Sequence, residues 1–195
     1  MIVSFYTGGA HCCMFHYVFE LEPAFRLLAT LNDADDDLSH FSLLGGDGQY
    51  YFVTADWTFA YWPGSFASSP NHSVVLRFVR DDDAGGYHIA WDKMRDPAPT
   101  SQEWEKDLAE VRRALKDDGP PGDRAATLWN KVLDLIYTGH SELAWKFLDE
   151  MGPKAQEPPF PNLGDFCSIL KRSIYWPDLA ATLKDVPAAC VNAKP

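Results

Sequence analysis

The residues best suited to chemistry stand near the start of the chain, where two histidines and two cysteines fall within six residues. They are His11, Cys12, Cys13 and His16, and Gly8-Gly9-Ala10 precedes them. Imidazole nitrogens and thiolates are ligands that zinc prefers, so this spacing is compatible with a metal site. A cysteine nucleophile with His11 or His16 as its base is the second chemical interpretation.

The strand geometry expected for this region argues against both interpretations. Successive side chains of a strand point to opposite faces, so Cys12 and Cys13 diverge, as do Cys13 and His16. Only a sharp turn would gather all four groups, and no other part of the chain completes a recognisable site. We therefore predict a structural role at a glycine-shaped turn, either as a disulfide or as buried thiols, and no bound metal.

The other two cysteines, Cys167 and Cys190, lie near the end of the sequence. Four cysteines permit three pairings, so the sequence does not determine the connectivity. We favour a disulfide between Cys167, on an expected helix, and Cys190, in the tail, because that bond would anchor the tail.

Known catalytic motifs are absent from the sequence. It contains no G-x-G-x-x-G, no G-x-x-x-x-G-K-[ST], no H-E-x-x-H and no G-x-S-x-G, and Gly64-Ser65-Phe66 lacks the second glycine of a nucleophile elbow. The carboxylates fall in runs on expected loops, which is typical of a solvated surface. We assign no catalytic residue and no cofactor, and the sequence favours a non-enzymatic role.

The predicted secondary structure changes from strands to helices near residue 95. Before it, short apolar runs alternate with Gly/Asp turns such as Gly45–Gly48 and Asp81–Gly86, which indicates an antiparallel β-meander over residues 1–95. Asn32–Asp37 is interpreted as a solvated acidic loop. The expected strands are Ile2–Tyr6, Met14–Leu21, Phe25–Leu31, Phe41–Leu44, Tyr50–Thr54, Val74–Val79 and Tyr87–Trp91.

After Pro97–Pro99 the apolar spacing becomes helical, and residues 100–195 are expected to form a bundle of about five short helices. Thr100 and Glu103 have the spacing of a capping box, and Ser141 is expected to cap the third helix. Gly139 should close a tight αα-hairpin. The expected helices run from Thr100 to the Gly119-Pro120 break and over Arg124–Thr138, Ser141–Met151, Leu163–Arg172 and Pro177–Asp185.

The two regions are expected to share one core in an α+β fold. Apolar side chains occupy both parities of the first strands, for example Phe15 and Phe19 against Met14 and Val18, so both faces of the sheet need cover. The helical region is the source of cover that the sequence suggests.

Composition and charge limit the kinds of partner that the protein can bind. Apolar residues make up 46% of the 195, so the chain can build a core. The net charge is −11, with 12 acidic and 5 basic side chains in residues 1–95 (−7) and 16 and 12 in residues 96–195 (−4). No basic stripe is available for a phosphate backbone, so nucleic acid is excluded, and a basic protein, a cationic ligand or a metal ion is the better match.

The sequence gives two indications of location. No apolar run approaches the roughly 18 residues of a membrane span. The chain opens directly on the apolar run Ile2–Tyr6, which suggests that a signal or another segment precedes it. We therefore expect a periplasmic or secreted protein.

Several strings in the first half resemble bacterial secreted proteins of the FG-GAP/VCBS repeat type. They are Tyr6–Cys13, Phe25–Leu28, the following Gly/Asp loop and Asp56–Tyr61 with Ser65–Ala67, and the resemblance covers about residues 2–80. It implies hairpins arranged like propeller blades and a calcium loop of the form D-x-D-G-D-G-x-x-E. Here Leu43, Gly45 and Tyr51 stand where that loop has carboxylates, so Asp47 alone remains and we expect no calcium site.

These observations favour an extracytoplasmic protein-binding module, in the manner of an inhibitor or immunity protein against a basic, lysozyme-like enzyme. The alternatives are a Cys/His-dependent hydrolase or metal enzyme, and a structural module of a larger envelope protein. Aromatic residues in a Gly/Pro/Ser-punctuated stretch are the candidate anchors, with core packing as the competing interpretation. They are Trp57, Phe59, Tyr61, Trp62 and Phe66.

Overall fold

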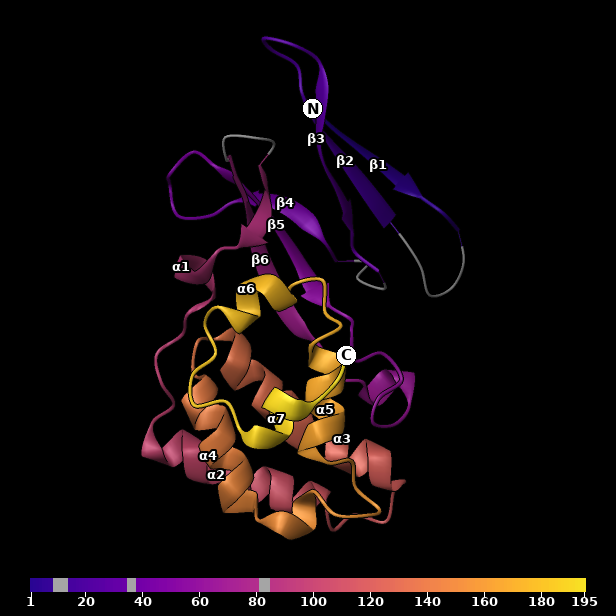
Figure 1. Cartoon of the computed structure of the whole chain (residues 1–195), viewed down its shortest axis with the longest axis vertical. Coiled ribbons are helices and arrows are strands. Elements are labelled where there is room, and N and C mark those ends of the chain that lie inside the picture. Colours follow the sequence, from indigo (N-terminus) through magenta and orange to yellow (C-terminus); the bar gives the residue numbers. More distant parts are fainter. Residues whose placement is uncertain (9–13, 35–37, 81–84) are drawn as a thin grey trace. The chain divides into compact units, whose positions relative to one another are not determined.

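The computed structural model describes residues 1–8, 14–34, 38–80 and 85–195 (Figure 1). It is an α+β structure with two antiparallel sheets and seven α-helices among these residues, as the sequence predicts. Internal contacts divide it into two compact units, residues 1–57 with 73–93 (unit 1) and residues 58–72 with 94–195 (unit 2). A shared core between them stays a prediction.

Unit 1 contains both sheets. Sheet A has the order β1-β2-β3, and sheet B has the order β4-β5-β6-β7, with β6 beginning at the boundary residue His72. The hairpins predicted around Gly45–Gly48 and Asp81–Gly86 are both confirmed, as the β4–β5 and β6–β7 pairs. The strands are β1 Ile2–Tyr6, β2 Met14–Glu20, β3 Arg26–Asn32, β4 His40–Leu43, β5 Tyr50–Asp56, β6 His72–Val79 and β7 Gly86–Ile89.

One face of sheet A is covered within unit 1 itself. His16 and Val18 of β2 are buried on this face, and the His16 ring meets Phe41 and Phe52 of sheet B at centroid distances of 5.8 and 5.0 Å. The expectation that the helices alone could cover the sheet is therefore wrong for this face. Sheet B supplies the cover because its strands β4 and β5 present aromatic side chains toward β2.

Unit 2 contains most of the described helices, and five of them overlap the helices expected from the sequence. The Thr100–Glu103 capping box is confirmed, since each residue's side chain bonds to the other's backbone N–H. Ser141 is not a cap: it is the first residue of its helix, and His140 stands at the N-cap position. The helices of the chain are α1 Trp91–Met94, α2 Ser101–Ala114, α3 Pro121–Tyr137, α4 Ser141–Met151, α5 Leu163–Leu170, α6 Trp176–Ala180 and α7 Ala188–Asn192.

The predicted αα-hairpin between α3 and α4 is confirmed. Helix α3 ends in a Schellman motif. The N–H of His140 donates to the Leu135 carbonyl at 2.7 Å, and the N–H of Gly139 donates to the Ile136 carbonyl at 3.2 Å. Gly139 has φ +85°, a left-handed conformation in which a side chain would be strained. The glycine therefore fixes the reversal between the two helices.

The core of unit 2 includes a segment that the sequence placed in the β region. Residues 58–72 belong to this unit, where Phe59 and Phe166 stack at a centroid distance of 5.0 Å. Phe166 also stacks on Trp129 of α3 at 4.8 Å. The carboxylate of Asp123 holds the same segment by accepting bonds from Ser65 N–H and Ser68 Oγ–H at 2.7 and 2.6 Å.

Candidate functional site

The histidine and cysteine cluster is described only in part. His11, Cys12 and Cys13 lie outside the described residues, so the predicted glycine-shaped turn and its disulfide stay predictions. His16 is buried in β2, with 5% of its surface exposed. Among the residues that the structure describes, no group of three or more His, Cys, Asp or Glu side chains is arranged to hold a metal ion.

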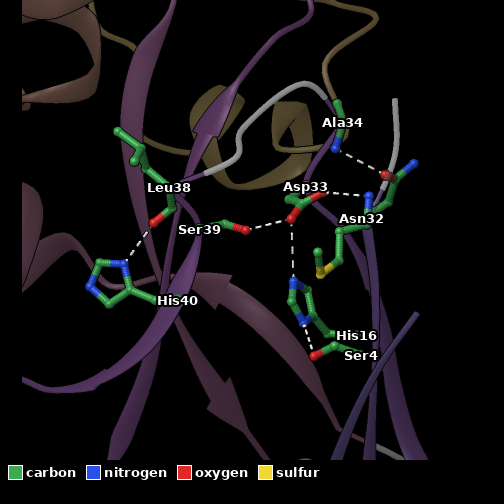
Figure 2. A network of polar contacts seen from close by, with 9 residues as sticks. Ser4, His16, Asn32, Asp33, Ala34, Leu38, Ser39 and His40 are labelled. Atoms are coloured by element: carbon green, nitrogen blue, oxygen red, sulfur yellow. Dashed lines mark hydrogen bonds and ion pairs between the residues drawn. The ribbon is translucent and has the colours of Figure 1, made fainter. Parts of the chain in front are cut away.

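His16 instead belongs to a polar network on the inner face of sheet A (Figure 2). Its Nε2 lies 3.3 Å from Oδ2 of Asp33, and its Nδ1 lies 2.8 Å from Oγ of Ser4 on β1. Asp33 is 3% exposed and accepts two further bonds, from the Met14 N–H at 2.9 Å and from the Ser39 hydroxyl at 2.5 Å. Every oxygen of this buried carboxylate therefore has a partner.

The chemistry of the partners assigns the protons of the network when the imidazole is neutral. A carboxylate can only accept, so His16 donates to Asp33 through Nε2–H. The other ring nitrogen, Nδ1, then carries the lone pair that accepts the Ser4 hydroxyl proton. The result is a serine–imidazole–carboxylate line in which the carboxylate fixes the imidazole tautomer.

Neither end of this line is among the residues expected from the sequence to form a site. Asp33 is buried, which corrects the expectation of a solvated acidic loop over Asn32–Asp37. The physical reason is that Asp33 directly follows β3, where Met14 and His16 of the neighbouring strand can reach its oxygens. Ser4 is flanked by the apolar residues Ile2, Val3 and Phe5, and this was the only sequence signal that set it apart.

The opposite face of sheet A carries a row of apolar side chains, here called the aromatic face. By strand alternation and register these residues point away from His16 and Val18. The outer members are between 45% (Val3) and 66% (Phe25) exposed, and Phe25 stacks on Phe19 at a centroid distance of 5.1 Å. The aromatic face consists of Val3, Phe5, Phe15, Tyr17, Phe19, Phe25 and Leu27.

Unit 1 is strongly acidic, and its cations are already paired. It contains 12 Asp and Glu against 4 Lys and Arg, a net charge of −8. Arg26 and Arg80 both bond to Glu20 at 2.5 Å, and the bond from Arg80, followed by that from Arg26, lowers the pKa of Glu20. Arg77 and Lys93 share Asp92, at 2.8 and 3.7 Å. The remaining carboxylates leave this unit with a negative field.

The five aromatic residues predicted as binding anchors differ in how far they are buried. Phe59 is fully buried in unit 2, which removes it from the candidate anchors because its surface is used by the core. Trp62 is half-buried against Phe59 and Trp129 at centroid distances of 5.5 and 5.4 Å. Tyr61, 64% exposed, forms a pair with the half-buried Phe66 at 5.2 Å.

Trp57, the remaining candidate anchor, is the last residue of the first segment of unit 1 and is half-buried. The other four candidates belong to unit 2. Within unit 2, Tyr61 and Phe66 are the two that keep the character of surface anchors.

One hollow within unit 2 has a volume of about 490 Å³ and lies beside α2 and α3. Three of the charged side chains in its lining are bonded within the protein: Lys131 Nζ lies 2.9 Å from Asp107, and Asp134 lies 3.3 Å from His72. The hydrogen bond from His72 lowers the pKa of Asp134. These three charges are therefore already compensated by protein groups and are less available to a ligand.

In the Gly/Asp loop between β4 and β5, the carboxylate of Asp47 is bonded to other groups of the protein. Asp47 accepts bonds from the Tyr51 hydroxyl and, at 3.0 Å, from the Gln49 N–H; these two bonds, and then the charge of Lys93, lower the pKa of Asp47. The Lys93 ammonium lies 5.4 Å from the centroid of the Tyr51 ring. A Cβ on Gly45 would lie 2.5 Å from that ammonium, so the glycine leaves room for it.

We expect millimolar calcium to leave the melting temperature of the protein unchanged. One carboxylate, already bonded and standing near an ammonium group, cannot supply the six to eight oxygens that calcium takes, so binding is weak and stabilisation negligible. Thermal unfolding with calcium and with a chelator measures this. A rise of several degrees that disappears in Asp47→Asn would contradict the expectation.

Cys167 and Cys190 lie at disulfide distance, with Cα atoms 5.1 Å apart, so the structure confirms the favoured pairing. Both are buried, Cys167 on α5 and Cys190 on α7. Lys171 provides a second anchor for the tail, since its ammonium donates to the carbonyls of Val191 and Ala193 at 3.1 and 2.7 Å.

Comparison of the chain with protein-family models, with curated proteins and with solved structures finds no match. The resemblance to the FG-GAP/VCBS type therefore stays a prediction. In the described part of the chain, no helix has the length and apolar character to cross a membrane.

Proposed function

We propose that the protein is an extracytoplasmic protein-binding module and that unit 1 recognises a basic partner, in the manner of an inhibitor or immunity protein against a lysozyme-like enzyme. The aromatic face carries this proposal. Contiguous exposed apolar surface of this kind is typical of protein-interaction sites, and aromatic residues are enriched among the anchors of interfaces.

The charge of unit 1 indicates the chemistry of the partner. With a net charge of −8 and each of its four basic side chains bonded to an acid, the unit attracts a positively charged surface. The disulfide supports an oxidising location, because such bonds persist outside the reducing cytosol.

Binding of the full chain to a basic lysozyme, measured by biolayer interferometry and by inhibition of cell-wall lysis, tests the proposal. We expect Phe5→Ser and Phe25→Ser each to weaken binding by about 30-fold, the size of an interface hot spot. Raising the salt concentration should slow association.

Tyr61→Ser is the matched control, because Tyr61 is an equally exposed aromatic residue that belongs to unit 2. Unchanged binding of Tyr61→Ser would support the aromatic face. Loss of binding in Tyr61→Ser alone would overturn it in favour of the Tyr61–Phe66 pair. Absence of any binding to the basic enzyme would overturn the proposed partner class.

A further inference from the structure

We propose that Ser4 is an activated nucleophile and that Ser4, His16 and Asp33 form an acyl-transfer site that acts on esters with an apolar acyl group. This site is independent of the aromatic face, because the two lie on opposite faces of sheet A. The proposal adds an activity to the binding function and does not require it.

The three side chains have the geometry of a nucleophile, a base and an orienting acid. Ser4 Oγ lies 2.8 Å from His16 Nδ1, and His16 Nε2 lies 3.3 Å from Asp33 Oδ2, so nucleophile, base and orienting carboxylate follow one another within hydrogen-bond reach (Figure 2). The ring nitrogens are used in the order opposite to that of the serine-protease triad, but their roles are the same. Asp33 is a positioning residue, held in place by Met14 and Ser39.

Exposure to solvent differs between Ser4 and its two partners. His16 and Asp33 are almost completely buried, which protects the base and its carboxylate from water. Ser4 is exposed, as is every residue of β1. Because the Ser4 proton is directed to His16, the lone pairs of Oγ are left for a molecule that approaches from solvent.

Strand β1 lies at the edge of sheet A. Among the strands that the structure describes, its only partner is β2, so its other edge is free. Met1 and Phe19 exchange N–H···O bonds, both of 2.8 Å, and hydrogen-bonded pairs alternate along an antiparallel ladder. Val3 therefore bonds to β2, whereas the Ser4 backbone N–H faces the edge. That N–H is a donor beside the nucleophile for the oxyanion of an acyl-transfer intermediate.

The side chains beside Ser4 suggest the substrate class. Ile2 and Tyr6 stand two residues before and after Ser4, on the same face of the strand, and they are 41% and 56% exposed. They would contact an apolar acyl chain attached to the carbonyl that Ser4 attacks. No charged residue occurs in β1, so the strand itself offers no partner for an anionic acyl group.

The step balances within these groups and the ester. Ser4 Oγ attacks the ester carbonyl, its proton passes to His16 Nδ1, and the carbonyl electron pair moves onto the oxyanion. The oxyanion then collapses, the bond to the alkoxy group breaks, and that group takes the proton from His16. The product is an acyl ester on Ser4, which water hydrolyses with His16 again as the base.

Labelling of the full chain with a fluorophosphonate, followed by peptide mass spectrometry, tests the activation of Ser4. The Oγ–P bond forms, the P–F bond breaks, the fluoride ion leaves, and the proton passes through His16 to water. We expect Ser4 to be labelled at least 100-fold faster than Ser68, whose hydroxyl donates to the carboxylate of Asp123 and has no imidazole partner. Equal labelling of the two serines would overturn the proposal.

Two variants separate activation from folding. His16→Gln should lower the Ser4 labelling rate by about 100-fold or more, and Asp33→Asn should lower it while leaving Ser68 labelling unchanged. Fluorescence and circular dichroism verify that each variant is folded. If a variant does not fold, the ratio of Ser4 to Ser68 labelling in the unsubstituted chain decides the question alone.

Hydrolysis of p-nitrophenyl esters tests the acyl preference. We expect hexanoate to react faster than acetate, with Ser4→Ala inactive toward both. Equal turnover by Ser4→Ala would overturn the assignment of the nucleophile, and a preference for acetate would overturn the role of Ile2 and Tyr6.

Discussion

Phe166→Ala should lower the free energy of unfolding of unit 2 by about 3–5 kcal/mol, the range for removing a buried phenyl ring. Phe166 is fully buried and stacks on both Trp129 and Phe59, at centroid distances of 4.8 and 5.0 Å. These rings come from α3 and from the segment before β6, so the cavity would lie where three parts of the chain meet. Rigid aromatic neighbours cannot collapse fully into the space.

Denaturant unfolding, followed by tryptophan fluorescence, measures this loss. Phe160→Ala is the matched control, because Phe160 is half-buried in the same unit and the Arg124 guanidinium lies 5.1 Å from the centroid of its ring. Its removal should cost about 1 kcal/mol, since a partly exposed ring buries less surface. Similar losses in the two variants would contradict the placement of Phe166 at the centre of the core.

Removing the Cys167–Cys190 bond, by replacing both residues with serine, should lower the free energy of unfolding by about 3 kcal/mol. The sequence separation is 23 residues, and a bond across a loop of this length restricts the unfolded chain. Thermal unfolding of the double variant and of the oxidised protein measures the difference. Replacing both residues avoids leaving a free thiol in the interior.

Two further observations bear on this prediction. Non-reducing peptide mapping should find the two cysteines joined, and free thiols at both positions would contradict it. A reducing agent should lower the melting temperature of the unsubstituted protein and leave that of the double variant unchanged. Retention of the Lys171 contacts to the tail would keep α7 docked even without the bond.

Much of the fold could be predicted from local sequence signals. The apolar runs and Gly/Asp turns indicated the strands, and Thr100 with Glu103 indicated the start of α2, because these signals act over a few residues. The place of segment 58–72 in unit 2 had no local signal, since its aromatic residues are equally compatible with a strand. Its attachment to α3 through Asp123 depends on contacts more than fifty residues apart in sequence.

The candidate site was less predictable for the same reason. The Ser4–His16–Asp33 line depends on the register of three strands, and a shift of one residue would place His16 on the other face. Asp33 stands in a run of acidic residues, where composition favours solvent. The aromatic face had a signal in the apolar residues of both parities, but the sequence did not show which face sheet B would cover.

The position of Lys93 has a consequence for how the β4–β5 hairpin depends on its surroundings. A bound metal ion exchanges with the medium, and its occupancy falls when the ion becomes scarce. The Lys93 ammonium is attached to the chain by covalent bonds and stands beside the loop of Gly45 and Asp47 whenever unit 1 is folded. The hairpin thus carries its own cationic group at a fixed local concentration, which scarcity of a free metal ion cannot remove.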